Sequence, residues 1–108
     1  MELNQAVKSL AALAQESRLA VYKMLVQAGP AGMAAGQISE QLGISASALS
    51  FHMKELTHAS LVTSRQEGRY VIYSAQIASM NDLLTYLTEN CCGGNPCSAS
   101  ASPAWPPP

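Results

Sequence analysis

The chain has 108 residues, 48% of them hydrophobic, which suffices for one domain with a modest core, and a monomer of this size would gain stability from dimerisation. The formal net charge of −1 excludes a strongly basic protein that wraps nucleic acid, so any DNA contact must come from basic side chains placed locally. With no apolar run of about eighteen residues and no basic-then-apolar N-terminus, we expect a cytoplasmic protein without a membrane partner.

Two helices are expected at the N-terminal end of the chain. The first has an apolar stripe at intervals of three and four residues, made of Leu3, Val7, Leu10 and Ala14. The second is expected to be largely buried and to end at Gly29-Pro30. The stretch 29–36 that follows is predicted to be a loop.

The middle of the chain carries the pattern of a helix-turn-helix. A short helix over residues 35–42 ends at Gly43, and a second helix begins with Ser45 as its N-cap and reaches about residue 59. Its core stripe consists of Leu49, Met53 and Leu56. Two helices joined through a glycine turn are typical of this motif.

The remaining elements complete a winged fold. Residues 62–65 and 70–73 are rich in β-branched and aromatic side chains, and the Glu67-Gly68 dipeptide between them predicts a β-hairpin. A last helix is expected over residues 76–90, with Ile77, Met80, Leu84 and Leu87 on one stripe and Leu83 beside it. The predicted fold class is mainly α with a small β-hairpin, a winged helix-turn-helix. The two terminal helices are expected to pack on each other and on a second subunit in a homodimer.

The chain is expected to divide at residue 90. Residues 1–90 form the DNA-binding and dimerisation domain. Residues 91–108 form a segment that contains the three cysteines and then a flexible tail rich in Ser, Ala and Pro.

Four residues on the outward side of the second helix of the motif are candidates for reading DNA. Ser47 and Ser50 could bond bases or phosphates, Phe51 could touch a thymine methyl group, and Lys54 could neutralise a phosphate. The alternative is an ordinary solvated helix face. His52 projects beside the core stripe and is expected to be a packed structural side chain.

Arg65 and Arg69 flank the turn of the predicted hairpin, where a wing would meet the minor groove or the DNA backbone. The alternative interpretation is two solvated arginines.

Three runs resemble the ArsR/SmtB family of metal-sensing repressors: LGISASALSFHMKEL at 42–56, ASLV at 59–62 and EGRYVIY at 67–73. The resemblance covers about residues 5–90 and implies a dimeric winged helix that binds a palindromic operator in its metal-free form. Ser60 departs from the family, which usually has Gly there, and a left-handed Ser would cost about 1 kcal/mol relative to Gly.

The sensing sites best known in the family are missing. Residues 36–39 read GQIS where arsenic sensors carry a Cys-x-Cys pair, and no histidine follows His58 to bind zinc on the last helix. Cys91, Cys92 and Cys97 instead resemble a branch of arsenic(III) sensors with three cysteines after the last helix. Soft thiolates select thiophilic centres, three sulfurs satisfy As(III), and zinc would need a fourth ligand. Adjacent cysteines cannot share a helix face, so the helix should end there, and the two glycines that follow let Cys97 turn back.

These observations predict a repressor that responds to arsenic(III) or antimony(III), needs no cofactor, binds operator DNA as a dimer and is released when As(III) binds the three thiolates. A thiol-redox-responsive repressor, a methylarsenite-selective sensor and a free-thiol tail without a role stay open as alternatives. A thiol enzyme fits poorly, because the cysteines follow a helix C-terminus without basic neighbours.

Overall fold

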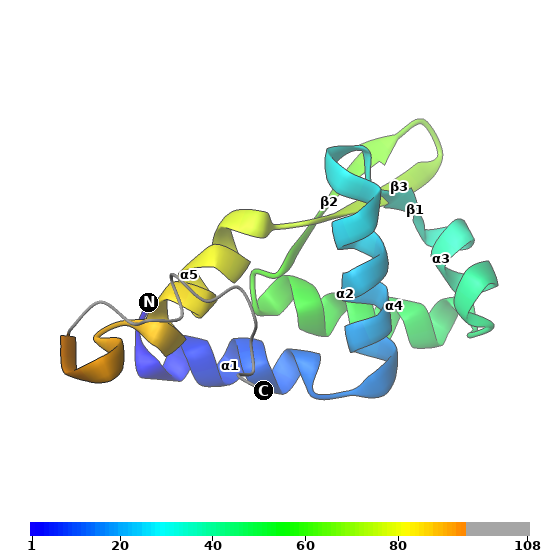
Figure 1. The fold of residues 1–108 in the computed structure, drawn as a ribbon. Helices are drawn as coiled ribbons and strands as arrows, with labels where there is room; N and C mark the ends of the chain where they lie inside the picture. The colour runs from blue at the N-terminus through cyan, green and yellow to red at the C-terminus, as the bar shows by residue number, and fades with distance from the viewer. Residues whose placement is uncertain (95–108) are drawn as a thin grey trace, which may run out of the picture.

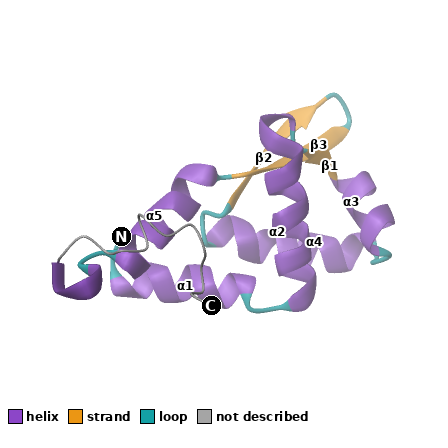
Figure 2. Ribbon diagram, viewed as in Figure 1, coloured by secondary structure: helices purple, strands orange, loops and turns teal. Residues whose placement is uncertain are grey.

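The structure is a computed structural model that describes residues 1–94. In chain order these residues form α1 (Leu3–Leu13), α2 (Glu16–Ala28), the 3-10 turn η1 (Gly29–Ala31), β1 (Met33–Ala34), α3 (Ala35–Leu42), α4 (Ala46–His58), β2 (Val62–Glu67), β3 (Tyr70–Ala75), α5 (Ile77–Thr88) and the 3-10 turn η2 (Cys91–Gly94). The chain is mainly helical with a small antiparallel sheet, which confirms the predicted fold class (Figure 2).

The core lies where α2, α3 and α4 meet the base of the sheet. Its largest fully buried side chains include Val21, Leu25, Ile38, Met53, Leu56, Leu61 and Val62. The predicted inner stripe of α4 is confirmed, because Leu49, Met53 and Leu56 are all at most 2% exposed. Burial of each such side chain stabilises the fold by about 1.5–3 kcal/mol. This burial fixes which face of α4 is left to solvent.

The helix-turn-helix consists of α3 and α4. After α3 the chain turns at Gly43, whose φ of 66° is left-handed and whose N–H donates to the Ser39 carbonyl oxygen. At the start of α4, the Ser45 side chain accepts a hydrogen bond of 3.1 Å from the Ala48 N–H. Ser45 therefore acts as the predicted N-cap.

The wing hairpin, β2 and β3, is extended by β1 into a three-stranded antiparallel sheet of order β1-β3-β2. Glu67 pairs with Tyr70, so the hairpin turn is Gly68-Arg69, one residue later than predicted. Gly68 has a positive φ of 63°, as the first central residue of a type II′ turn requires. β1 lies in the stretch 29–36, which was expected to be a loop. The sequence does not indicate this strand, because two residues are too few to show the alternating apolar and polar pattern of a strand.

The helices α1 and α5 contact each other on the side of the molecule away from the wing (Figure 1). The α1 side chains buried in the monomer are the small Ala6, Ser9 and Ala12. Six large apolar side chains of these two helices are exposed, namely Leu3, Val7, Leu10, Ile77, Leu84 and Leu87. α5 buries Leu83 and ends at Thr88, two residues before the predicted end. Within residues 1–94, no helix is long and apolar enough to cross a membrane.

The second helix is less buried than predicted. Val21, Tyr22 and Leu25 are buried, but Leu19 and Val26 are 48% and 42% exposed, so α2 buries only one face. The hydroxyl of Tyr22 is buried and has no hydrogen-bond partner within the described residues. Burial raises the pKa of Tyr22 above its ordinary value of 10.0.

Candidate nucleic-acid interface

The face of α4 opposite its buried stripe is open to solvent. Ser47, Ser50 and Lys54 are exposed, and Phe51 is 57% exposed, so the four predicted DNA-reading residues of this helix share one outward side. The Ser47 hydroxyl lies 3.3 Å from that of Ser45 at the start of the helix. Hydroxyls, an aromatic ring and an ammonium group are suited to contact base edges, thymine methyl groups and phosphates.

A large apolar side chain at the centre of this face requires an explanation. The ring of Phe51 meets the ring of His52 edge-on, with the centroids 5.7 Å apart and the planes at 65°. His52 is half-buried, and its Nδ1 lies 3.4 Å from Nη1 of Arg18 on α2. His52 is thus a packed side chain, as expected, and it links Phe51 to the interior.

Arg65, on β2 of the wing, folds back onto η1. Its Nη2 donates to the Ala31 carbonyl oxygen at 2.8 Å, and its Nη1 lies 3.4 Å from the Pro30 carbonyl oxygen and 3.2 Å from the Ser74 hydroxyl. Its Nε forms an ion pair of 2.6 Å with Glu67. In this structure the guanidinium therefore ties the wing to the end of α2. The two carbonyl partners are 34 and 35 positions away in sequence, and no local pattern indicates them.

Arg69 occupies the other predicted position. It is exposed in the turn between β2 and β3. This turn forms the tip of the wing (Figure 1). A cation at a wing tip can reach the minor groove or the DNA backbone. We call the set Ser47, Ser50, Phe51, Lys54 and Arg69 the DNA-facing surface.

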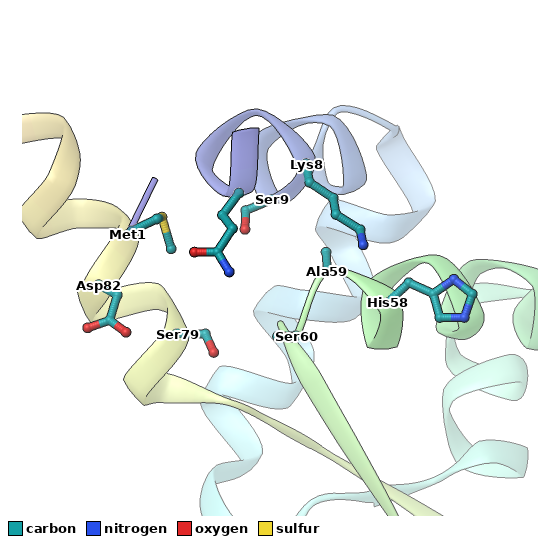
Figure 3. Close-up of a pocket in the computed structure, with 9 residues that line it drawn as sticks. Met1, Lys8, Ser9, His58, Ala59, Ser60, Ser79 and Asp82 are labelled. Carbon is teal, nitrogen blue, oxygen red and sulfur yellow. The ribbon is translucent and has the colours of Figure 1, made fainter. Parts of the chain in front are cut away.

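A cavity of about 330 Å³ adjoins the end of α4 and is lined by α1, α4 and α5 (Figure 3). Lys8 of α1 and His58 of α4 lie on one side of it, and Asp82 of α5 lies on the other. Lys8 and His58 also line a second opening between α1 and α4, together with Arg18 and Glu55. Lys8 and Arg18 place two positive charges beside α4, against Glu55 in the same opening, and the net charge of the chain conceals this local arrangement. No local sequence pattern places Lys8 and Arg18 beside α4, because only the fold brings them to this helix.

The cysteine segment follows α5 directly. Cys91 and Cys92 lie in η2, and both are exposed. Positive φ values at Asn90, Cys92 and Gly93 break the helical path, so α5 ends before the cysteine pair, as predicted. Cys97 and the tail lie outside the described residues. Within residues 1–94, no group of three His, Cys, Asp or Glu side chains is placed to hold a metal ion.

Comparison with protein families identifies the central elements. A model of a helix-turn-helix domain matches residues 13–65, which span α2 to the middle of β2.

Similar proteins extend this match over most of the chain. The transcriptional activator HlyU of Vibrio cholerae is 37% identical over 89 residues, covering 78% of this chain and 80% of its own. Its structure has a TM-score of 0.64 and covers 81% of this chain and 97% of its own. An ArsR-like transcriptional regulator from Rhodococcus has a TM-score of 0.73 at 25% identity and covers 93% of this chain and 92% of its own.

A third solved structure is described as homodimeric. It is the winged helix-turn-helix domain of a possible ArsR-family regulator from Mycobacterium bovis, with a TM-score of 0.65 and 23% identity. It covers 86% of each chain. At this identity the likeness concerns the fold.

Proposed function

The chain belongs to the ArsR family of winged-helix transcriptional regulators, and we propose that it is a repressor that responds to arsenic(III) and antimony(III). A dimer without inducer binds double-stranded operator DNA, and it is released when As(III) binds the thiolates of Cys91, Cys92 and Cys97. The observation that carries the proposal is the vicinal cysteine pair immediately after α5, followed by a third cysteine.

The chemistry of the three thiols supports arsenic rather than zinc. Trivalent arsenic forms a pyramid with three sulfur ligands, whereas structural zinc takes four ligands in a tetrahedron. Adjacent residues of a helix point in different directions, so a vicinal pair can bind one centre only where the helix has ended. The breaks at Asn90 and Cys92 meet this condition. The glycines at 93 and 94 would let the chain bring Cys97 back to the pair.

The exposed apolar side chains of α1 and α5 support a dimer. Six large ones face solvent in the monomer, and on each helix they recur at intervals of three, four or seven residues, so they lie on one face of that helix. Exposed apolar helix faces of this kind often mark an interface. The test is Leu84→Glu on α5, which should yield monomers in sedimentation and weaken operator binding. The matched control is Val26→Glu, which places the same charge on an exposed apolar position of α2, 42% exposed, and should stay dimeric. A dimer that survives Leu84→Glu would place the interface elsewhere.

The dimer connects sensing to DNA release. Helix-turn-helix dimers place their two reading helices in successive major grooves about 34 Å apart, so operator affinity depends on the dimer interface. Binding of the thiolates to As(III) would release protons, join the three cysteines at one centre and shift α5 against the partner subunit. The two α4 helices would then no longer match the operator spacing.

An operator is first selected from random DNA with the reduced protein. The selected DNA is then labelled, and binding of the protein to it is followed by fluorescence anisotropy. Arsenite, antimonite, methylarsenite, zinc and peroxide are added separately to the complex. We expect arsenite and antimonite to release the DNA, while Cys91→Ser, Cys92→Ser and Cys97→Ser variants bind the operator normally but are not released. Arsenite release that persists in one of these variants would remove that cysteine from the site.

Two other inducers fit the same cysteines. A methylated arsenical has one valence blocked and needs only two thiols, which Cys91 and Cys92 could supply. A redox sensor would instead join two cysteines, and peroxide would release it with rescue by dithiothreitol. Because the matched HlyU is named an activator, the titration is paired with a reporter gene that measures the direction of regulation.

A further inference from the structure

Three side chains of α2 and α4 form a connected row that ends on the DNA-facing surface. Arg18 Nη1 lies 3.4 Å from His52 Nδ1, and the His52 ring meets the Phe51 ring edge-on at 5.7 Å. Arg18 and His52 are half-buried, while Phe51 is 57% exposed. The row therefore runs from beneath α4 to the side that faces DNA.

Arg18 is held firmly at the start of this row. Its Nε donates to the Ala12 carbonyl oxygen at 2.6 Å, and its backbone N–H donates to the Gln15 side chain at 2.9 Å. Ala12 lies in the last turn of α1, where carbonyl groups have no partner within the helix. Because the guanidinium is a rigid planar fork, the bond from Nε also sets the direction of Nη1.

The contact with Arg18 fixes the histidine ring as well. Arg is only a donor, so His52 Nδ1 accepts in this contact. The contact holds the orientation of the His52 ring, which meets the Phe51 ring edge-on. An exposed Phe without such a neighbour would sample several rotamers and lose that freedom on binding DNA.

We propose that Arg18, acting through His52, is a positioning residue that preorganises Phe51 to contact a thymine methyl group in the major groove. The inference rests on the proposed DNA binding and is independent of arsenic sensing. It assigns Arg18 to sequence discrimination rather than to phosphate neutralisation, although Arg18 lines the cationic opening beside α4.

The experiment replaces each thymine of the selected operator by deoxyuracil, which removes only the methyl group. For the wild-type protein we expect one thymine in each half-site whose replacement weakens binding about fourfold, which equals about 0.8 kcal/mol, the usual value for one buried methylene. The Phe51→Ala variant should bind the thymine operator and its deoxyuracil counterpart with equal affinity. Arg18→Gln should reduce the methyl effect to less than about twofold and leave the slope of log K against log salt unchanged.

The controls separate positioning from folding and from charge. Lys23→Gln removes one positive charge from an exposed position of α2, the helix that carries Arg18. This variant should still bind the thymine operator about fourfold more tightly than the deoxyuracil operator. Arg18→Lys keeps the charge but not the fork, so it should lose the methyl effect while the protein still folds and binds the operator. His52→Asn keeps an acceptor for Arg18 but removes the ring, and it should also lose the effect.

Two results would overturn the inference while the protein still binds DNA. One is an undiminished methyl effect in Arg18→Gln. The other is a salt slope that falls by about 1 in that variant, which would make Arg18 a phosphate contact. A wild-type protein that selects no DNA sequence would refute the proposed function itself.

Discussion

Replacing Arg65 by Gln should destabilise the fold while leaving the number of phosphate contacts unchanged. The guanidinium bonds the Ala31 carbonyl oxygen, the Pro30 carbonyl oxygen and the Ser74 hydroxyl at 2.8–3.4 Å. A hydrogen bond of this kind contributes about 0.5–1.5 kcal/mol, and the half-exposed ion pair with Glu67 adds at most about 1 kcal/mol. Allowing for solvent exposure and for bonds that Gln retains, we expect a loss of about 1–2 kcal/mol.

Urea unfolding measures this loss, and operator titrations at several salt concentrations measure the phosphate contacts. Each phosphate contact contributes about 0.9 to the slope of log K against log salt. Arg69→Gln is the matched control on the same hairpin, and the opposite result is expected. The free energy of unfolding should change little, and the slope of log K against log salt should fall in magnitude by about 1. If Arg65→Gln keeps full stability and lowers the slope, Arg65 contacts DNA and the structural role assigned to it is wrong.

Three further predictions concern stability. Tyr22→Phe should raise the free energy of unfolding by about 1 kcal/mol, because it removes a buried hydroxyl that has no hydrogen-bond partner within residues 1–94. Since the folded pKa of Tyr22 is raised, ionisation of this side chain leaves the free energy of unfolding unchanged below about pH 10 and lowers it above that pH, and the variant should lack this contribution in alkaline urea titrations. Ser60→Gly should stabilise by up to about 1 kcal/mol in thermal melts, because Ser60 has a left-handed φ of 62°. Gly32→Ala should destabilise by more than about 2 kcal/mol, since its Cβ would overlap the Tyr73 carbonyl oxygen and φ is +70°; an unchanged melting temperature would contradict that geometry.

The sequence predicts those elements whose signals are local. The spacing of Leu49, Met53 and Leu56 defines the inner face of α4, and that face in turn defines the outward set that includes Phe51 and Lys54. Caps are local as well, which explains why Ser45 is identified correctly. The left-handed conformation at Ser60, inferred from a single departure from the family, is also present.

Features that depend on distant contacts could not be predicted in this way. Helical periodicity detects the apolar stripe of α1, but the monomer buries a neighbouring side made of the small residues Ala6, Ser9 and Ala12. The strand β1 exists only because β3 pairs with it, and Arg65 meets its carbonyl partners only after the sheet has formed. The contact between Arg18 and His52 crosses 34 positions of sequence and joins two helices.

The central claim is that arsenic binding and operator binding oppose each other through one dimer, and calorimetric titration of arsenite tests it most directly. The titration is run on the reduced protein, free and saturated with operator. If arsenite weakens operator binding a hundredfold, linkage requires DNA to weaken arsenite binding by the same factor, a coupling of about 2.7 kcal/mol. We expect one arsenic per chain and this loss of affinity in the complex. Equal arsenite affinity in the two states, or no binding to the free protein, would contradict the account.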